Sequence, residues 1–274
     1  KLLDNNIPVF LVNYINQHTT IIKLTNKEHM LRPYDDAPTP EDLSRLSSQE
    51  KVTLRRRGEE YLSGLLSGKG GQDSLFKTYK NEALIYGTRS EFINRLGADP
   101  NKPLVVIMCH SWPDFPNGYG PTYFTDYVEW VLITISIVKE IGNCSWVLKP
   151  HPGELFYGDK TTLRKVVGKE LPDGIYYWPD DAGGAELVSY VHCIVTARGT
   201  SAIEYSAAGL RTVCATVSPF SDFGISRVAT TKQEYIDILH GIDSMPAVTD
   251  EEKWKLVFRN DFLDLLSQNP SDFQ

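Results

Sequence analysis

Short apolar runs alternate with amphipathic segments along the second half of the chain. The runs have the length of β-strands and are apolar throughout, which is typical of strands buried on both faces of a parallel sheet. The segments between them have helical periodicity, as in residues 123–141, where Tyr127 and Val131 share one face. The predicted strands are residues 104–109, 145–148, 175–178, 192–196 and 211–215. This alternation predicts an α/β fold with a doubly wound parallel sheet.

Capping signals mark where several of the helices begin. Thr88-Arg89-Ser90-Glu91 has the pattern of a capping box, in which each terminal side chain bonds the other residue's backbone. Thr231 and Thr249 precede acidic residues with the same spacing. The other predicted helices are residues 48–66, 161–167, 184–190 and 200–208.

The first quarter of the chain has a weaker pattern. Residues 7–12 and 19–24 read as short strands, and the first of them is interpreted as the last strand of a shortened N-terminal half. Gly68-Lys69-Gly70-Gly71 follows a helix and lacks the spacing of a phosphate loop, so a linker is expected there. The predicted division is an N-terminal segment (1–97), an α/β domain (98–245) and a C-terminal helix (246–274).

Composition narrows the class of protein. With 274 residues, 41% of them hydrophobic, the chain can build one large domain or two small ones. The formal net charge of -7 argues against nucleic acid as the main partner. The chain begins without Met, as a fragment of a longer protein would.

Cellular location is inferred from three features. The four cysteines form no Cys-x-x-Cys pair and are expected to be buried, reduced thiols of a cytosolic protein. The longest apolar stretch, residues 130–138, is too short to span a bilayer, and the first residues lack a signal-peptide pattern. A cytoplasmic location is therefore expected, and peripheral association with the inner face of the membrane stays open.

Polar residues directly follow four of the predicted strands. In doubly wound sheets, ligands bind outside the carboxyl ends of the strands, so these residues are the candidates for chemistry. The four groups, in chain order, are His110-Ser111-Trp112-Pro113-Asp114, Lys149-Pro150-His151-Pro152, Asp180-Asp181 and Arg198-Gly199-Thr200-Ser201.

The Gly199-Thr200-Ser201 segment is suited to an anion. Glycine admits a phosphate closely, and the free N–H groups at the start of the next helix favour negative charge. Glu204, one turn into that helix, is placed to accept hydrogen bonds from ribose hydroxyls. The alternative is that Thr200 or Ser201 merely caps the helix.

Lys149-Pro150-His151-Pro152 forms a rigid turn, because each proline fixes its own φ angle. Lys149 and His151 can both donate to a phosphate, and a protonated His151 would stabilise charge on a departing nucleotide. The alternative is a stiff loop with a surface histidine.

These motifs together resemble those of GT-B glycosyltransferases of the capsule polysaccharide synthesis and Kdo transferase type. Residues 149–152 are similar to the His-Pro motif of that group, which bacterial sialyltransferases and polyol-phosphate transferases share. Residues 196–209 are similar to its Ser/Thr motif and to the helix that carries a ribose-binding Glu. The resemblance covers about residues 98–225. It implies a Rossmann-like nucleotide-sugar-binding domain at 98–245 and a partial acceptor-side domain at 1–97.

The resemblance also implies roles for individual residues. His151 would contact the donor phosphate, Thr200 and Ser201 would bind its oxygens, and the base would lie against residues 177–180. Arg198 stands where relatives often have a small residue, so it either contacts phosphate or faces solvent. The full donor-binding set implied is Lys149, His151, Pro152, Trp178, Arg198, Gly199, Thr200, Ser201 and Glu204.

The catalytic base is the least defined element of the site. Asp114 and His110 are the nearest ionisable groups, and Asp35 and Asp36 are rivals; formation of a turn is the alternative role of Asp114. No His, Cys, Asp and Glu set has metal-ligand spacing, so metal-independent transfer without a cofactor is expected.

The expected function is transfer of a sugar from a nucleotide-sugar donor, CMP-Kdo or another, to a cell-surface polysaccharide. The implied partners are the nucleotide sugar and a glycan or glycolipid acceptor. Three alternatives stay open: a CDP-glycerol-type polyol-phosphate transferase, a sugar-nucleotide epimerase, and a non-catalytic module that binds nucleotide or glycan.

Overall fold

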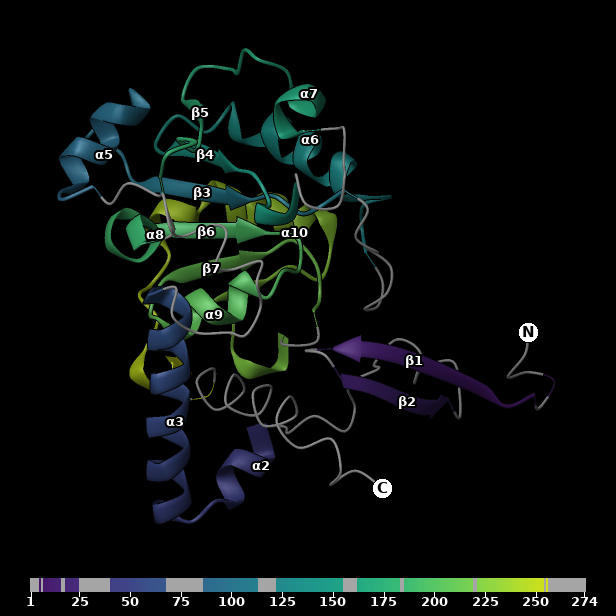
Figure 1. Cartoon of the computed structure of the whole chain (residues 1–274). Helices are drawn as coiled ribbons and strands as arrows, with labels where there is room; N and C mark the ends of the chain where they lie inside the picture. The colour runs from purple at the N-terminus through teal and green to yellow at the C-terminus, as the bar shows by residue number, and fades with distance from the viewer. Residues whose placement is uncertain are drawn as a thin grey trace.

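A parallel β-sheet forms the centre of the computed structural model (Figure 1). The structure describes residues 5, 7–15, 18–24, 40–67, 86–112, 122–154, 162–182, 185–218, 221–253 and 255. In those residues the sheet has the order β5-β4-β3-β6-β7-β8, and every neighbouring pair is parallel. Its strands are β3 (Leu104–Met108), β4 (Ser145–Lys149), β5 (Ile175–Tyr177), β6 (Cys193–Thr196), β7 (Arg211–Cys214) and β8 (Arg227–Val228).

The strand order confirms the predicted fold class. The chain starts in the middle at β3, runs outward through β4 to β5, then returns beside β3 at β6 and runs outward again to β8. This is the doubly wound, Rossmann-like order, and its switch point lies between β3 and β6. The edge strand β8 was not predicted, because two residues are too short to show a periodicity.

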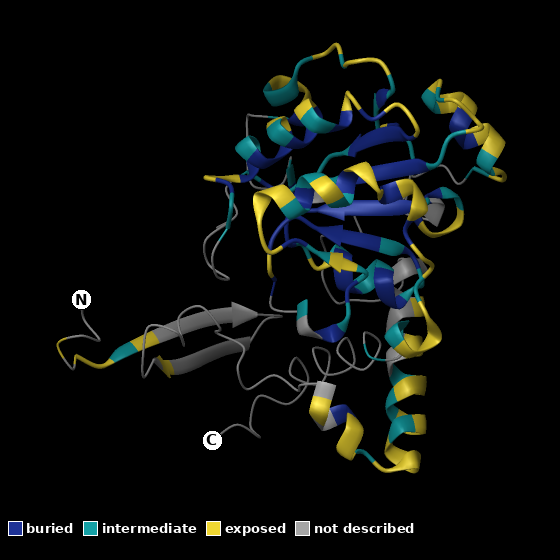
Figure 2. Cartoon of the chain, turned by 180° about the vertical axis from the view of Figure 1, so that it is seen from behind, coloured by how far each residue is buried: buried dark blue, intermediate teal, exposed yellow. Residues whose placement is uncertain are grey.

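Helices cover both faces of the sheet. The described helices of this part are α5 (Arg89–Leu96), α6 (Tyr127–Val138), α7 (Leu163–Val167), α8 (Ala185–Tyr190), α9 (Ser201–Ala207) and α10 (Lys232–His240), with short 3-10 turns η2 (Pro152–Glu154), η3 (Ser221–Phe223) and η4 (Ile242–Ser244). Val105 packs in one core with α6 and α10, whereas Val106 packs in another with α5 and α8. Successive residues of a strand point to opposite faces, which explains the division. Figure 2 shows the strands buried and the helices exposed on their outer sides.

The helix boundaries follow the capping residues. Thr88 and Glu91 form the predicted capping box of α5, and Gly97, with φ 71°, ends that helix. The predicted helix over 123–141 is shorter in the structure. Its start is delayed because the side chain of Asp126 accepts the amide hydrogen of Glu129 and caps α6. Thr231 caps α10 in the same way.

The N-terminal part has its own small elements. These are β1 (Val9–Ile15), β2 (His18–Leu24), α2 (Pro40–Arg45) and α3 (Ser48–Ser67). The predicted helix over 48–66 is confirmed. The interpretation of 7–12 as the last strand of a shortened half is wrong for the described residues, because β1 pairs antiparallel with β2 in a separate two-stranded sheet. Residues 68–71 lie outside the described residues.

Leu43 and Leu54 join α2 and α3 to the main domain. They pack in a core with Ile203 of α9 and with Phe223. In Figure 1, the upper end of α3 accordingly lies beside α9.

All four cysteines are buried and form no disulfide. Burial raises the pKa of the Cys144 thiol to about 11 and that of Cys214 to about 12, and it raises the pKa values of Cys109 and Cys193 as well. The buried thiols match the sequence-based expectation. Among the described residues, no helix combines the length and the apolar character that crossing a bilayer requires.

Candidate functional site

The carboxyl ends of β3, β4 and β6 bring the predicted site residues to one edge of the sheet. These three strands are neighbours and run parallel, so the segments that follow them lie side by side. His110 follows β3, His151 follows β4, and the loop 198–200 connects β6 to α9. This edge includes the switch point, where ligands of doubly wound sheets bind.

His110 lies at the centre of this edge. Its Nε2 is 3.0 Å from the hydroxyl oxygen of Thr196 and 3.5 Å from the amide nitrogen of Arg198. Its ring stacks on Tyr127 of α6, with 4.0 Å between the ring centroids and 7° between the planes. Trp130 contacts the ring edge-on at 5.8 Å. The imidazole is therefore held by an aromatic ring and by the β6–α9 loop.

Burial makes His110 a neutral group. Burial, together with the smaller effects of the charges of His151 and Arg198, lowers the pKa of His110 to about 3. An imidazole with that pKa is a poor proton acceptor in catalysis. These properties favour a positioning role for His110 over the predicted catalytic one, and they place His151 and Arg198 within electrostatic range of its ring.

A chain of hydrogen bonds connects His110 to the loop. The amide of Gly199 donates to the Thr196 hydroxyl at 3.3 Å, and that hydroxyl can donate in turn to Nε2 of His110. The Arg198 amide donates to the same Nε2. This network assigns the ring proton to Nδ1. The loop conformation thus depends on a neutral His110.

Gly199 is closely packed, so that a side chain at this position would make its neighbours shift. A Cβ at this position would lie 3.1 Å from the Thr196 hydroxyl, 3.2 Å from the Ser201 hydroxyl and 3.3 Å from Cε1 of His110. These contacts show that Ser201, Thr196 and His110 surround the glycine. This close packing accounts for a glycine at position 199, and the predicted approach of a phosphate to it stays a prediction.

The hydroxyl of Thr200 does not cap α9. Thr200 has helical dihedral angles, its side chain makes no capping bond, and it is exposed. The alternative in which Thr200 serves as an ordinary cap is therefore wrong. The Ser201 hydroxyl likewise has no hydrogen-bond partner among the residues that the structure describes. Both hydroxyls stand beside the first amide groups of α9, which have no acceptor within the helix. Glu204 lies in the first turn of the helix, as predicted.

Arg198 points into the protein. Its side chain is only 4% exposed, and its Nη2 donates to the hydroxyl of Thr216, which follows β7, at 3.2 Å. The alternative in which Arg198 faces solvent is therefore wrong. Burial raises the pKa of the Cys214 thiol, and the charge of Arg198 offsets part of that rise. Arg198 supplies a positive charge beneath the loop, close to His110.

The segment after β4 turns later than predicted, where the amide of Glu154 donates to the carbonyl of His151 at 3.0 Å. The amide of Gly153 donates to Nδ1 of His151 at 3.0 Å, so the ring proton of a neutral His151 is on Nε2. Pro152 begins the 3-10 turn η2. His151 is half-buried, which does not match the alternative of a surface histidine. The backbone therefore fixes which ring nitrogen of His151 can donate to a ligand.

Lys149 and Trp178 contact each other beside this turn. The ammonium group of Lys149 lies 5.1 Å from the centroid of the Trp178 ring. Trp178 itself is 3% exposed, donates to the carbonyl of Ala182 at 3.1 Å and packs on Phe92. The Trp178 ring is thus part of the core that supports Lys149.

Three residues at this edge were given no individual role from the sequence. Ser111 is 1% exposed, and its hydroxyl and the indole N–H of Trp112 have no hydrogen-bond partner among the described residues. Buried polar groups without partners are rare and commonly mark a ligand site. Tyr127, which stacks on His110, is the third. The position directly after a buried strand selected Ser111 and Trp112 from the sequence as part of a candidate group, whereas Tyr127 was assigned only to a helix face.

The aspartates named from the sequence fall into two groups. Asp114, Asp35 and Asp36 lie outside the described residues. Asp180 and Asp181 pair with Arg164 at 3.3 Å and Arg95 at 3.4 Å. Within the described part of the chain, no cluster of three His, Cys, Asp or Glu side chains could hold a metal ion.

Known proteins with similarity to this chain are found among solved structures. No family model matches the chain. No curated protein matches it either. Among solved structures, it is similar to the "Thermosulfurimonas dismutans KpsC, beta Kdo 2,4 transferase", with 13% identity and a TM-score of 0.47. The match covers 91% of this chain and 64% of that chain, so this chain spans less than two thirds of the transferase's length.

Proposed function

We propose that this chain binds a nucleotide sugar at the carboxyl ends of β3, β4 and β6 and transfers the sugar to a glycan. The observation on which the proposal rests is the assembly around His110. Its ring contacts Thr196 and lies against Gly199, within electrostatic range of His151 and Arg198. Donors and positive charge therefore converge at the switch point, where an anionic ligand of this fold would bind.

The chemistry follows from the charge that develops on the leaving group. An acceptor hydroxyl forms the new bond to the anomeric carbon and gives its proton to a base, for which Asp114 is the candidate from the sequence. The bond between the sugar and the phosphate oxygen breaks at the same time, and negative charge accumulates on the departing nucleotide. In the proposed mechanism, Nε2 of His151 and the ammonium group of Lys149 donate to that phosphate. The hydroxyls of Thr200 and Ser201 bind its other oxygens, and Glu204 binds the ribose. Donors fixed in advance stabilise such charge without reorganisation, so this mechanism needs no metal ion.

The proposed donor is a cytidine nucleotide sugar such as CMP-Kdo, and the proposed acceptor is a cell-surface glycan or glycolipid. The donor class is supported by the resemblance of residues 149–152 and 196–209 to the motifs of transferases that use cytidine donors. The cytosine ring of the donor would lie near Trp178, whose own ring contacts Lys149.

A thermal-shift panel of CMP, CDP, UDP and GDP tests the proposal. A nucleotide at about 100 times its Kd adds about 2.7 kcal/mol to the free energy of unfolding, which is readily measured as a higher melting temperature. We expect stabilisation by the cytidine nucleotides. His151→Ala should remove the shift, whereas His240→Ala, an exposed histidine at the end of α10, should keep it. If no nucleotide stabilises the chain, or if His151→Ala responds as the wild type does, the proposal is wrong.

A further inference from the structure

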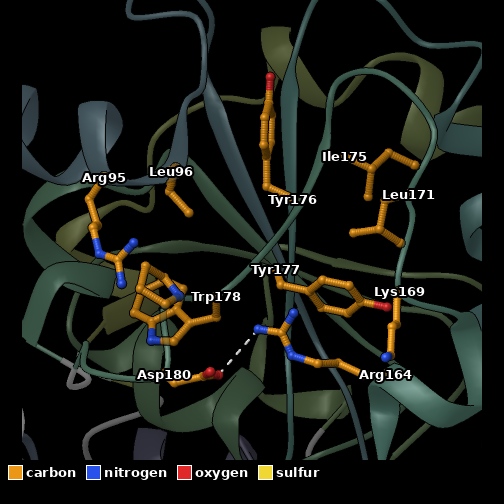
Figure 3. Close-up of a pocket in the computed structure, with 11 residues that line it drawn as sticks. Arg95, Leu96, Arg164, Lys169, Leu171, Ile175, Tyr176, Tyr177, Trp178 and Asp180 are labelled. Carbon is orange, nitrogen blue, oxygen red and sulfur yellow. Dashed lines mark hydrogen bonds and ion pairs between the residues drawn. The ribbon is translucent and has the colours of Figure 1, made fainter.

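A pocket of about 370 Å³ lies along the free edge of β5 (Figure 3). This size is within the range of about 300–1,000 Å³ that is usual for small-molecule sites. Its lining includes Trp178, on whose ring Lys149 lies, so the pocket adjoins the candidate donor site without containing His151 or the β6–α9 loop.

The lining of the pocket is rich in positive charge. Arg95, Arg164 and Lys169 line it, with Asp180 as the lining carboxylate. The three cations come from α5, from α7 and from the segment after α7, so they are spread along the strand edge. Arg95 also pairs with Asp181 at 3.4 Å, so Lys169 carries the excess positive charge here, in contrast with the net charge of -7 for the whole chain.

The ion pairs at the pocket are easily exchanged. Arg164 pairs with Asp180 at 3.3 Å, but the Asp180 side chain is 84% exposed, and such pairs contribute little in water. Lys169 has no ion-pair partner among the residues that the structure describes. An incoming anion can therefore take the place of Asp180 on Arg164 and can bind Lys169 directly.

An aromatic ring is fixed beside these cations. The guanidinium carbon of Arg164 lies 4.3 Å from the centroid of the Tyr177 ring, and the Tyr177 hydroxyl donates to the carbonyl of Gly168. Figure 3 shows the guanidinium between the Tyr177 ring and Asp180. Arg164 is thus held in place while its charged end faces the pocket.

The open edge of β5 adds backbone hydrogen-bonding groups. Trp146 donates to the carbonyl of Gly174, and Trp178 donates to the carbonyl of Leu148, each at 2.9 Å. Bonding alternates along a strand, so the backbone groups of Tyr177 point away from β4 toward the open side. They offer one donor and one acceptor to a polar ligand.

We propose that this pocket binds an acidic glycan. Carboxylates of successive sugars would pair with Arg164, Lys169 and Arg95, and sugar hydroxyls would bond the backbone of Tyr177. A row of cations from three elements suits carboxylates spaced along a chain better than a single phosphate, on which donors converge. The inference rests on the proposed function in one respect: it names the acceptor of that transferase as an acidic glycan.

Isothermal titration of the whole chain tests the pocket. The probe is a short oligogalacturonide, and the control ligand is a neutral glucan oligomer of the same length. We expect the acidic oligomer to bind and the neutral one not to bind. Arg164→Gln combined with Lys169→Gln should weaken binding by about tenfold through the loss of two charge-assisted contacts. Lys139→Gln, which removes an exposed charge at the end of α6, should have no effect.

The outcomes separate this inference from the proposed function. If the acidic oligomer fails to bind, or binds the double variant equally well, the pocket assignment is wrong, whatever CMP does. If CMP displaces the oligomer, the pocket belongs to the donor nucleotide and the assignment is again wrong. If the oligomer binds as expected but no nucleotide stabilises the chain, the glycan site stands and the transferase proposal fails. Both substituted side chains are exposed, so the fold should tolerate their replacement.

Discussion

Nε2 of His110 lies 3.0 Å from the hydroxyl of Thr196, and this contact joins the end of β3 to the end of β6. The two strands are neighbours at the switch point of the sheet. The same nitrogen accepts the amide hydrogen of Arg198. His110 therefore sets the conformation of the β6–α9 loop, which would bind a phosphate, although the imidazole itself need not contact the ligand.

Replacement of His110 tests this positioning role. His110→Phe keeps the stack on Tyr127 but removes Nε2, which leaves the proton of the Thr196 hydroxyl and the amide hydrogen of Arg198 without this acceptor. We expect a loss of about 1–3 kcal/mol in the free energy of unfolding. We also expect nucleotide affinity to fall by about tenfold, equivalent to about 1.4 kcal/mol. Urea denaturation and nucleotide titration measure the two effects.

His110→Gln is the matched variant, because its amide oxygen can replace Nε2 as acceptor while the stack is lost. It should bind nucleotide better than His110→Phe. Equal binding by His110→Phe and the wild type would contradict the positioning role.

The buried His110 also predicts a dependence of stability on pH. Its pKa is about 3 in the folded chain, against 6.5 as the ordinary value. Between these two values His110 binds a proton in the unfolded chain but not in the folded chain. The contribution of His110 to the free energy of unfolding is therefore complete well above pH 6.5 and is lost as the pH falls. From pH 6.5 to pH 5 the loss from this group is about 2 kcal/mol. Denaturation curves of the wild type and His110→Phe over this range measure it, and parallel curves would refute the prediction.

Gly199→Ala should disturb the same loop from the other side. The added methyl group would lie 3.1–3.3 Å from Thr196, Ser201 and His110, so these side chains must move. Overpacking of this kind costs about 1–3 kcal/mol of stability. Nucleotide binding should weaken in parallel. Gly142→Ala is the control, because a Cβ there meets nothing within 4 Å; a Gly199→Ala variant as stable as that control would show that the loop yields freely.

Tyr235→Phe separates stability from ligand binding. The Tyr235 hydroxyl is fully buried and accepts from Nε1 of Trp130 at 3.2 Å, with Thr134 at 2.8 Å. Its removal leaves buried polar groups unpaired and should cost about 1–3 kcal/mol. Melting temperature should fall, and the nucleotide-induced shift should remain. Loss of that shift would mean that packing between α6 and α10 also controls the site.

The fold was predictable where the pattern was strong. The runs at 104–108 and 193–196 are apolar throughout, which sufficed to predict buried parallel strands. The runs that became β1 and β2 were also recognised, but their pairing with each other was not, because an apolar run does not specify which strand it pairs with. The start of α6 at Tyr127 depends on one hydrogen bond, which the side chain of Asp126 accepts, and the spacing of apolar residues does not reveal such a bond.

The site was predictable only as a set of strand ends. The rule for doubly wound sheets selected His110, His151 and Gly199 before any contact was known. The burial of Arg198 could not be foreseen, because charged side chains are usually exposed and its partner Thr216 follows a different strand. The unpaired Ser111 hydroxyl likewise depends on tertiary packing.

Because every cysteine is buried, the rate at which each thiol reacts measures how readily the protein opens around it. A thiol reacts as the thiolate, and burial keeps the pKa of Cys144 and Cys214 far above neutral. Alkylation must therefore wait for the protein to open around each sulfur, and its rate reports the local free energy of opening. Cys109, next to His110 at the end of β3, samples the edge of the sheet where a ligand would bind. If a nucleotide slows the modification of Cys109 but leaves the rate at Cys144 unchanged, the ligand lies at this edge of the sheet, and no substitution is needed to show it.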